Sequence, residues 1–252
     1  STLGSNFTVG RDLVVTGNND GSTSSLATVD FTGLTQVGRD INLDNDNRTS
    51  GGATVNFSNL ANVGDDMTIS QIANSITATT ALTIVGDLTV NDNNDLCNAN
   101  LNGLQSTGGF LSFTDNYDAC GSQSIDLTNL QTVGGHLIIT GNDDMPSLVF
   151  TDLTAINGAD GSGRSVDITN NDQEMTSVMM PALNTGTAGE FRISGNAALQ
   201  TVNVPLLPSV GEDLRLEDNN AVSTLNFSAL SSVANLINID DEDAVTDLGG
   251  FA

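Results

Sequence analysis

An internal repeat is the feature that most constrains the fold of this chain. Val-Gly, a variable residue, an acidic or polar residue and then apolar-x-apolar recur about every 25 residues, a period within the range typical of solenoids. The clearest copies begin at Val37, Val63, Val85, Val133 and Val210. In a solenoid each repeat adds one coil and contacts only its neighbours. Residues 1–252 are therefore predicted to form a single domain of about ten coils.

Each repeat contains two short stretches in which apolar and polar residues alternate. Ile41–Leu43 is a first stretch, and Val55–Phe57 is a second, followed by Leu60. A period of two points alternate side chains to opposite faces of a β-strand. The sequence thus predicts an all-β chain, a right-handed β-solenoid (β-helix) with two strands in each coil. Residues 70–84 lack the second pattern, so an irregular third coil is expected there.

An asparagine follows the first strand of most coils at a constant distance. Such a residue, pointing inward at a corner, can hydrogen-bond the backbone of adjacent coils, where a turn otherwise leaves buried polar groups unpaired. We therefore predict an internal structural ladder. Its members are Asn18, Asn93, Asn116, Asn142, Asn171, Asn196 and Asn219.

Composition fits a long, thin core and a cationic partner or a salty medium. Apolar residues make up 38% of the chain and Trp is absent, which disfavours one thick core. No apolar run reaches the roughly 18 residues of a transmembrane helix, so no membrane insertion is expected. The 31 acidic residues outnumber the 6 basic ones, for a formal charge of −25. Such a field repels nucleic acid and favours cations or cationic partners.

Four aspartates occupy the position just before the first strand of consecutive coils. These are Asp12, Asp40, Asp66 and Asp87. Stacked carboxylates repel and raise each other's pKa unless a positive charge neutralises them. Because calcium takes oxygen ligands, this column is the hypothesis for a metal site. Solvated, salt-screened corners are the alternative, and no other cofactor is expected.

Two cysteines occupy the same phase of adjacent coils. Cys97 lies four residues after Asn93, and Cys120 lies four residues after Asn116. Positions stacked about 4.8 Å apart suit the Cα separation of a disulfide, so a Cys97–Cys120 bond is predicted, with two free thiols as the alternative. A disulfide indicates an oxidising, extracellular compartment. Asn47 begins an Asn-x-Thr sequon in a Gly/Ser-rich loop and is the predicted glycosylation site.

The repeat phrase over residues 133–148, with its Val-Gly-Gly-x-Leu-x-Ile run, Asn142 and Leu148, resembles the receptor L domain. That family has a leucine-rich-repeat-like layout and includes ligand-binding lobes of growth-factor receptors and fungal and bacterial surface proteins. The resemblance covers nearly the whole chain. It implies a right-handed solenoid outside the cell, with a non-catalytic role in binding or wall architecture.

No catalytic residue is expected, since the single histidine, His136, has no nucleophile motif near it. The first hypothesis is a secreted or cell-surface recognition, adhesion or wall-structural module. It would bind a protein or glycan partner with one long β face. The alternative is a filament or surface-layer subunit whose copies join end to end. Ice binding, through the column around Thr68, Thr89 and Ser112, and a carbohydrate-active protein are further alternatives.

Overall fold

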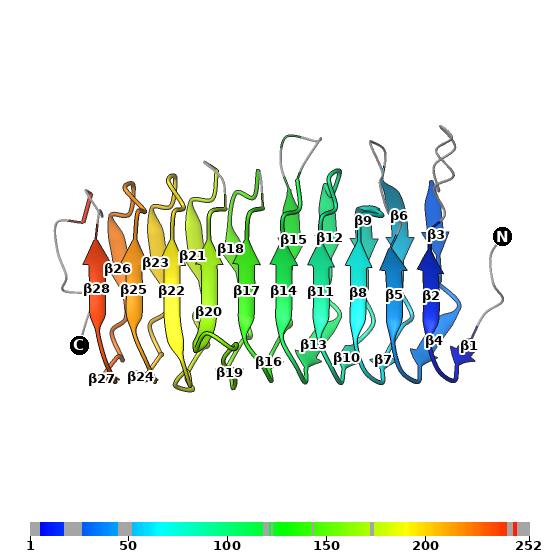
Figure 1. The fold of residues 1–252 in the computed structure, drawn as a ribbon, viewed down its shortest axis with the longest axis horizontal. Helices are drawn as coiled ribbons and strands as arrows, with labels where there is room; N and C mark the ends of the chain where they lie inside the picture. The colour runs from blue at the N-terminus through cyan, green and yellow to red at the C-terminus, as the bar shows by residue number, and fades with distance from the viewer. Residues whose placement is uncertain are drawn as a thin grey trace.

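The chain forms a parallel β-solenoid, shown in Figure 1 as a computed structural model. The structure describes residues 6–17, 27–44, 52–117, 121, 123–142, 144–171, 174–240 and 244–245. Three predicted site residues, Asn18, Asn47 and Cys120, lie outside them. Throughout the described ranges the regular elements are β-strands, and no helix is present. The predicted all-β solenoid is confirmed.

One parallel sheet extends along the whole solenoid and contains ten strands. Its strands are β2 (Leu13–Thr16), β5 (Ile41–Asp44), β8 (Met67–Ser70), β11 (Leu88–Asn91), β14 (Leu111–Thr114), β17 (Leu137–Thr140), β20 (Arg164–Thr169), β22 (Glu190–Ser194), β25 (Leu214–Glu217) and β28 (Ile237–Asp240). These strands point upward in Figure 1 on the near side, while the chain advances from right to left. The coil is therefore right-handed.

The second face precedes the ten-stranded sheet in every coil. A seven-stranded sheet covers most of it, and a two-stranded sheet lies nearer the C-terminus. The seven strands are β1 (Phe7–Val9), β4 (Leu34–Val37), β7 (Asn62–Val63), β10 (Leu82–Ile84), β13 (Leu104–Thr107), β16 (Thr132–Val133) and β19 (Ala155–Ile156). The other two are β24 (Ser209–Val210) and β27 (Ser232–Val233).

The third face follows the ten-stranded sheet and is divided into sheets of five and four strands. The five are β3 (Thr28–Asp30), β6 (Ala53–Asn56), β9 (Ala73–Thr77), β12 (Asn98–Asn100) and β15 (Ser124–Asp126). The four are β18 (Leu148–Val149), β21 (Ser177–Met179), β23 (Thr201–Asn203) and β26 (Thr224–Asn226). Successive strands of the ten-stranded sheet are one turn of the chain apart, so its ten strands correspond to about nine turns of the solenoid.

Most coils contain three strands, so the prediction of two strands in each coil was wrong. The additional strand is the one on the second face, for example Thr132–Val133. It has only one buried apolar side chain, Val133, after the corner residue Leu130. A stretch this short cannot show apolar alternation, which is why the sequence pattern does not reveal it.

The stretch over residues 70–84 also differs from expectation. Instead of an irregular turn, it contains β9 on the third face and β10 on the second. β9 pairs with β6 after one register shift between Ala53 and Thr54. Ile76 then pairs with Val55 and is fully buried. This coil is short, but it keeps every face of the solenoid.

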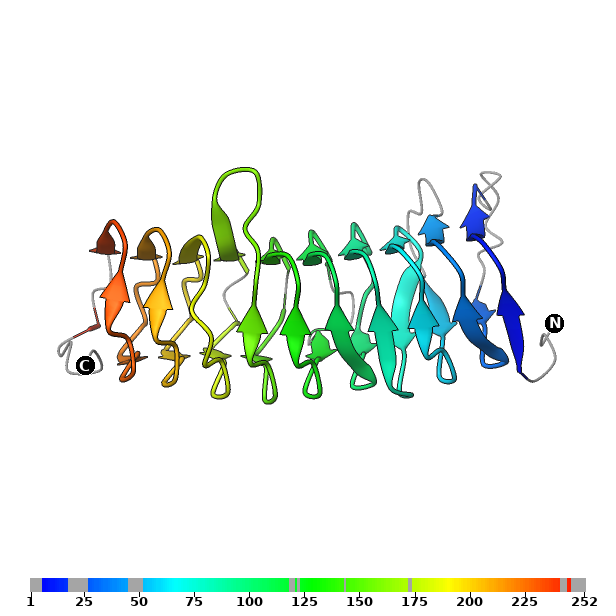
Figure 2. The same cartoon turned by 90° about the horizontal axis from the view of Figure 1, so that it is seen from below.

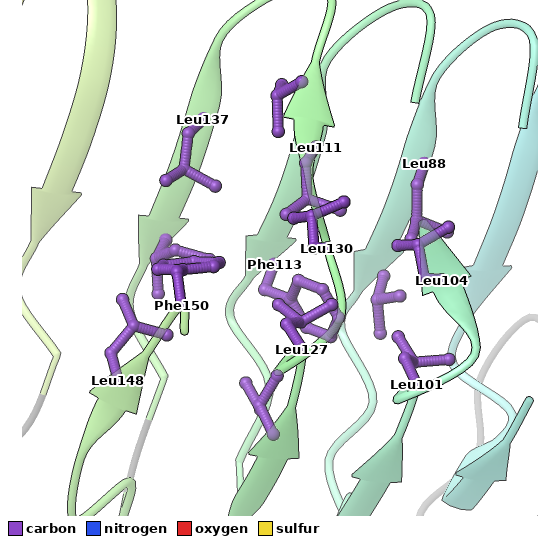
Figure 3. Close-up of a cluster of buried hydrophobic side chains, with 14 of the residues drawn as sticks. Leu88, Leu101, Leu104, Leu111, Phe113, Leu127, Leu130, Leu137, Leu148 and Phe150 are labelled. Atoms are coloured by element: carbon purple, nitrogen blue, oxygen red, sulfur yellow. The ribbon is translucent and has the colours of Figure 1, made fainter. Parts of the chain in front are cut away.

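The core is a column of thin apolar layers, one for each coil. Figure 3 shows Leu88, Leu101 and Leu104 from one coil facing the next layer, which contains Leu111, Phe113, Leu127 and Leu130. Strand residues alternate between buried and partly exposed, as in β17, where Leu137 and Ile139 point inward. Alternate inward side chains are the expected consequence of a period of two. The predicted thin core of Leu, Ile, Val and Phe is confirmed.

The Val-Gly phrase recurs because glycine is required where successive coils approach most closely. A Cβ on Gly134 would overlap the carbonyl oxygen of Gly108, and a Cβ on Gly64 would overlap that of Gly38. The backbone hydrogen bonds at this corner leave no room, since Gly134 N donates to Thr107 O at 2.8 Å. The corner between the second face and the ten-stranded sheet therefore selects glycine.

A continuous ladder of buried asparagines joins the coils at the corner after the ten-stranded sheet. Asn116 Nδ2 donates to Asn142 Oδ1 at 2.9 Å, and Asn142 Nδ2 donates to Asn171 Oδ1 at 3.0 Å. Each amide also donates to a backbone carbonyl of the preceding coil, as Asn142 does to Phe113 O at 2.9 Å. The predicted ladder is confirmed for its described members. They are Asn93, Asn116, Asn142, Asn171, Asn196 and Asn219.

The backbone before each ladder residue has a left-handed conformation. Asp115 precedes Asn116 with φ 53°, and Asn170 precedes Asn171 with φ 52°. Glycine takes this position before Asn142 and Asn196. Gly, Asn and Asp are the residues that adopt positive φ with least strain. The turn thus directs the following amide into the core.

Gly134→Ala should destabilise the fold, because the new Cβ forces two coils apart. Overpacking of this kind costs about 1–3 kcal/mol. The control is Gly161→Ala, since a Cβ on Gly161 meets nothing within 4 Å. Urea unfolding of both variants measures the difference. Equal midpoints for the two variants would contradict the close-approach argument.

Asn142→Ala should reduce the free energy of unfolding by at least about 2 kcal/mol, because it leaves buried partners unpaired. The side chain and backbone N–H of Asn116 both lose their acceptor, and Phe113 O loses its donor. Asn220→Ala, at an exposed position beside the ladder, is the control. Thermal and urea denaturation compare the two. A stability loss no larger than that of the control would show that the ladder is dispensable.

Candidate binding surfaces

The outer face of the ten-stranded sheet carries columns of small polar side chains in its middle section. Thr89 pairs in register with Thr68 on one side and Ser112 on the other. In β14 the neighbouring outward position is Thr114, and the hydroxyl of Thr140 lies 2.8 Å from that of Thr169. Because the strands are parallel and in register, identical positions repeat about every 4.8 Å.

Further toward the C-terminus the same face carries a lattice of opposite charges. Arg215 contacts Asp213 at 2.6 Å, Glu190 at 3.2 Å and Glu217 at 3.2 Å. Arg192 lies 4.0 Å from both Asp167 and Glu217, so it links neighbouring strands. The arginines of β20, β22 and β25 thus neutralise the carboxylates around them. Three arginines face four carboxylates here, so charge on this part of the face is largely offset despite the formal −25 of the chain.

Burial within this lattice affects the protonation of Glu190. Desolvation raises the pKa of Glu190, although the nearby Arg215 and Arg164 lower it. The hydrogen bonds of Arg215 to Asp213 and Glu217 raise the pKa of its guanidinium, which stays charged. The lattice therefore holds fixed positive charges beside the carboxylates, and burial disfavours the charged form of Glu190.

A short loop, residues 157–163, stands above the ten-stranded sheet between β19 and β20 (Figure 2). The Asp160 carboxylate accepts the backbone N–H groups of Ser162 and Arg164, both at 2.8 Å. Burial raises the pKa of Asp160, but these two hydrogen bonds together with the positive charge of Arg164 outweigh it and lower the pKa overall. The loop projects beside the ten-stranded sheet (Figure 2), so the outline of this face is not uniform.

The predicted aspartate column is present at the corner before the ten-stranded sheet, and its carboxylates bind the backbone. Asp66 Oδ1 accepts the N–H of Asp87 at 2.8 Å, and Asp87 Oδ1 accepts that of Phe110 at 2.8 Å. Asp40 Oδ1 accepts the N–H of Asp66 at 3.3 Å. Each carboxylate thereby satisfies an amide of the next coil, a structural role that the sequence reading missed.

The column is partly neutralised at its N-terminal end and crowded in the middle. Arg39 lies 3.6 Å from both Asp12 and Asp40. Asp40, Asp65 and Asp66 bring carboxylate oxygens within 4.8 Å of one another. Asp65 was not among the predicted ligands, although its position beside Asp66 could have indicated it. Neither Asp12 nor Asp87 belongs to this three-carboxylate group, and calcium binding stays a prediction.

The environment of Asp87 disfavours its charged form. Desolvation by burial raises the pKa of Asp87, the hydrogen bond from Phe110 opposes the shift, and the carboxylate of Asp66 adds to it. In the next two coils the position of the aspartate is occupied by Phe110 and His136, whose rings stack with centroids 5.0 Å apart. His136 thus occupies the aspartate column, as its sequence phase predicts, with an aromatic ring as its neighbour.

Cys97 is half-buried directly before β12 and carries no free thiol. Asn74 Nδ2 donates to its sulfur at 3.4 Å. In the strand pairing that follows, Asn98 pairs with Ser124. The segment from Asn116 to Ser124 is therefore longer than the equivalent segment from Asn93 to Asn98 in the preceding coil. Since Cys120 lies outside the described residues, the Cys97–Cys120 bond stays a prediction. The same holds for glycosylation at Asn47.

An open groove of about 270 Å³ lies on another side of the solenoid, beside β10, β13, β16 and β19. Amide side chains supply half of its lining residues, namely Asn102, Gln105, Asn129 and Gln131. This groove was not predicted from the sequence. The sequence signal that could have indicated the groove is the set of polar residues that flank the repeated corner leucines, such as Leu104 and Leu130.

Within the described part of the chain, no helix is long or apolar enough to cross a membrane.

The substitution Asp87→Asn distinguishes a structural role of the aspartate column from a metal-binding role. The pKa of Asp87 is higher in the folded chain than in the unfolded chain, so the carboxyl group stabilises the fold at pH values below its unfolded pKa. This contribution is lost as the pH rises through the folded pKa. Asparagine keeps the acceptor for Phe110 N–H without the charge. At pH 7 with excess chelator, the variant should therefore unfold at a higher temperature than the parent. The difference should vanish at pH 3.

Asp126→Asn is the matched control, because Asp126 Oδ1 likewise accepts a backbone N–H, that of Thr128. Its melting temperature should change little at either pH. Thermal melts in millimolar calcium complete the comparison. A parent chain that gains stability in calcium while Asp87→Asn does not would show that the column binds the metal.

No family model matches the chain, and no match was found among curated proteins or solved structures. The resemblance to the receptor L domain therefore extends as far as the parallel solenoid of repeats, which the structure shows.

Proposed function

We propose that this chain is a non-enzymatic, extracellular recognition or adhesion module that binds its partner over the outer face of the ten-stranded sheet. The observation that carries the proposal is the regular order of that face. Its backbone is paired along the entire solenoid, and its outward side chains repeat in register from Thr68 to Thr89 to Ser112. A rigid, extended polar array loses little conformational entropy when it binds a partner of similar size.

The chemistry of the face favours a polar macromolecular partner. Hydroxyls and amides in the middle section offer both donors and acceptors. The lattice around Arg192 and Arg215 adds charges whose positions are fixed by several ion pairs each. The overall charge of −25 disfavours polyanions. A protein or a glycan at the cell surface fits these properties.

Extracellular placement rests on separate observations. Cys97 carries no free thiol, which is typical of proteins in oxidising compartments. The parallel solenoid is also the layout that the receptor L domain resemblance implies for a surface protein. The alternative, a subunit that joins end to end, predicts polymers in solution rather than a monomeric rod.

The test is binding to an array of extracellular matrix proteins and cell-surface glycans, combined with light scattering. The parent should be monomeric and bind at least one partner. Thr68→Arg with Thr89→Arg should weaken that binding by about tenfold or more, a loss of about 1.4 kcal/mol. Thr54→Arg, at an exposed position on the third face, is the control and should bind normally.

Two results would contradict the proposal. Binding that survives the Thr68/Thr89 double substitution would place the site elsewhere. Polymers at micromolar concentration, with no partner on the array, would favour the end-to-end subunit.

A further inference from the structure

The open groove beside β10, β13, β16 and β19 has a composition unlike that of the ten-stranded face. Successive coils line it: Thr79 precedes β10, Gln105 belongs to β13, Gln131 precedes β16 and Asp152 precedes β19. Its long direction therefore follows the axis of the solenoid. Four coils span three steps of about 4.8 Å, so these side chains extend over roughly 14 Å.

Two glutamines form a column inside the groove. Gln131 N donates to Gln105 O at 2.9 Å, so the two residues occupy equivalent positions of neighbouring coils. Both side chains are exposed, and neither makes a hydrogen bond within the described chain. Each amide offers two N–H donors and a carbonyl acceptor. The column thus presents unused donors and acceptors at the spacing of the strands.

An asparagine at the adjacent corner is held in position. Asn129 Nδ2 donates to the backbone oxygen of Asn102 at 2.7 Å. This bond restricts the Asn129 side chain and leaves its Oδ1 available as an acceptor. A polar group already fixed in this way binds at lower entropic cost than a freely rotating one.

The lining excludes several kinds of ligand. It contains no arginine or histidine to bind a phosphate, sulfate or carboxylate, and it contains the carboxylate of Asp152. Ala81 is its only side chain with a purely apolar surface, so an apolar ligand would gain little. One carboxylate is also too few for a calcium ion, which takes 6–8 oxygen ligands.

We propose that this groove binds a neutral oligosaccharide, lying along the solenoid axis across neighbouring coils. The hydroxyl groups of a sugar both donate and accept hydrogen bonds, as the amides of Gln105 and Gln131 do. Asp152 accepts from further hydroxyls without needing a positive charge. This site is distinct from the outer face of the ten-stranded sheet, so the two proposals stand or fall separately.

Affinity electrophoresis in gels that contain neutral polysaccharides tests the site, with dextran, mannan, galactomannan and hydroxyethylcellulose as probes and alginate as an anionic comparison. An array of neutral oligosaccharides extends the panel. The parent should be retarded by at least one neutral glycan and not by alginate. Gln105→Ala with Gln131→Ala should weaken that binding by about tenfold or more, because two amide hydrogen-bond partners are lost.

Gln36→Ala is the matched control, because Gln36 is an exposed glutamine of β4, on the same face but outside the groove. It should retain parental affinity. Equal melting temperatures for all variants exclude unfolding as the cause of a loss, as expected for exposed positions. Absence of binding to every neutral glycan would overturn the proposal. So would binding that the double substitution leaves intact.

Discussion

The hydrogen bonding between successive coils is the constraint on which the rest of the structure depends. Strands on all three faces pair in parallel, so each coil must end one strand spacing from where it began. At the corners the backbone turns, and pairing between backbone groups satisfies only part of them. The ladder amides supplement it after the ten-stranded sheet, and the carboxylates of Asp40, Asp66 and Asp87 do so before that sheet. Each buried polar group left without such a partner would cost about 1–3 kcal/mol.

These constraints explain which features the sequence could predict. Columns that recur in most coils, such as the ladder amides and the inward residues equivalent to those of β17, leave a periodic trace. The Gly of the Val-Gly phrase recurs for a reason that is visible only in the coordinates, namely the close approach to the preceding carbonyl. Strands as short as Thr132–Val133 leave no alternation to detect. Pairing between coils defines them, and that pairing is not local in sequence.

The aspartate column shows that the same periodicity reveals only part of a residue's role. From the sequence, stacked carboxylates imply repulsion that a bound cation would relieve. In the structure, backbone N–H groups of the next coil bind the Asp66 and Asp87 carboxylates. Hydrogen bonds to the charged form stabilise it, so part of the repulsion is already offset. A sequence pattern gives the position of a charge but not the direction of the backbone dipoles around it.

The division between corners and faces also explains why the candidate binding surfaces could not be assigned from the repeat. Inward positions and corners are restricted by packing and hydrogen bonding, so the same residue types recur there. Outward positions are free of these restrictions, and they change from hydroxyls near Thr89 to charges near Arg192. Each outward residue is nevertheless held at the strand spacing of about 4.8 Å. A solenoid therefore fixes the geometry of its surface while leaving its chemistry variable, and recognition can differ from one face to another of the same rod.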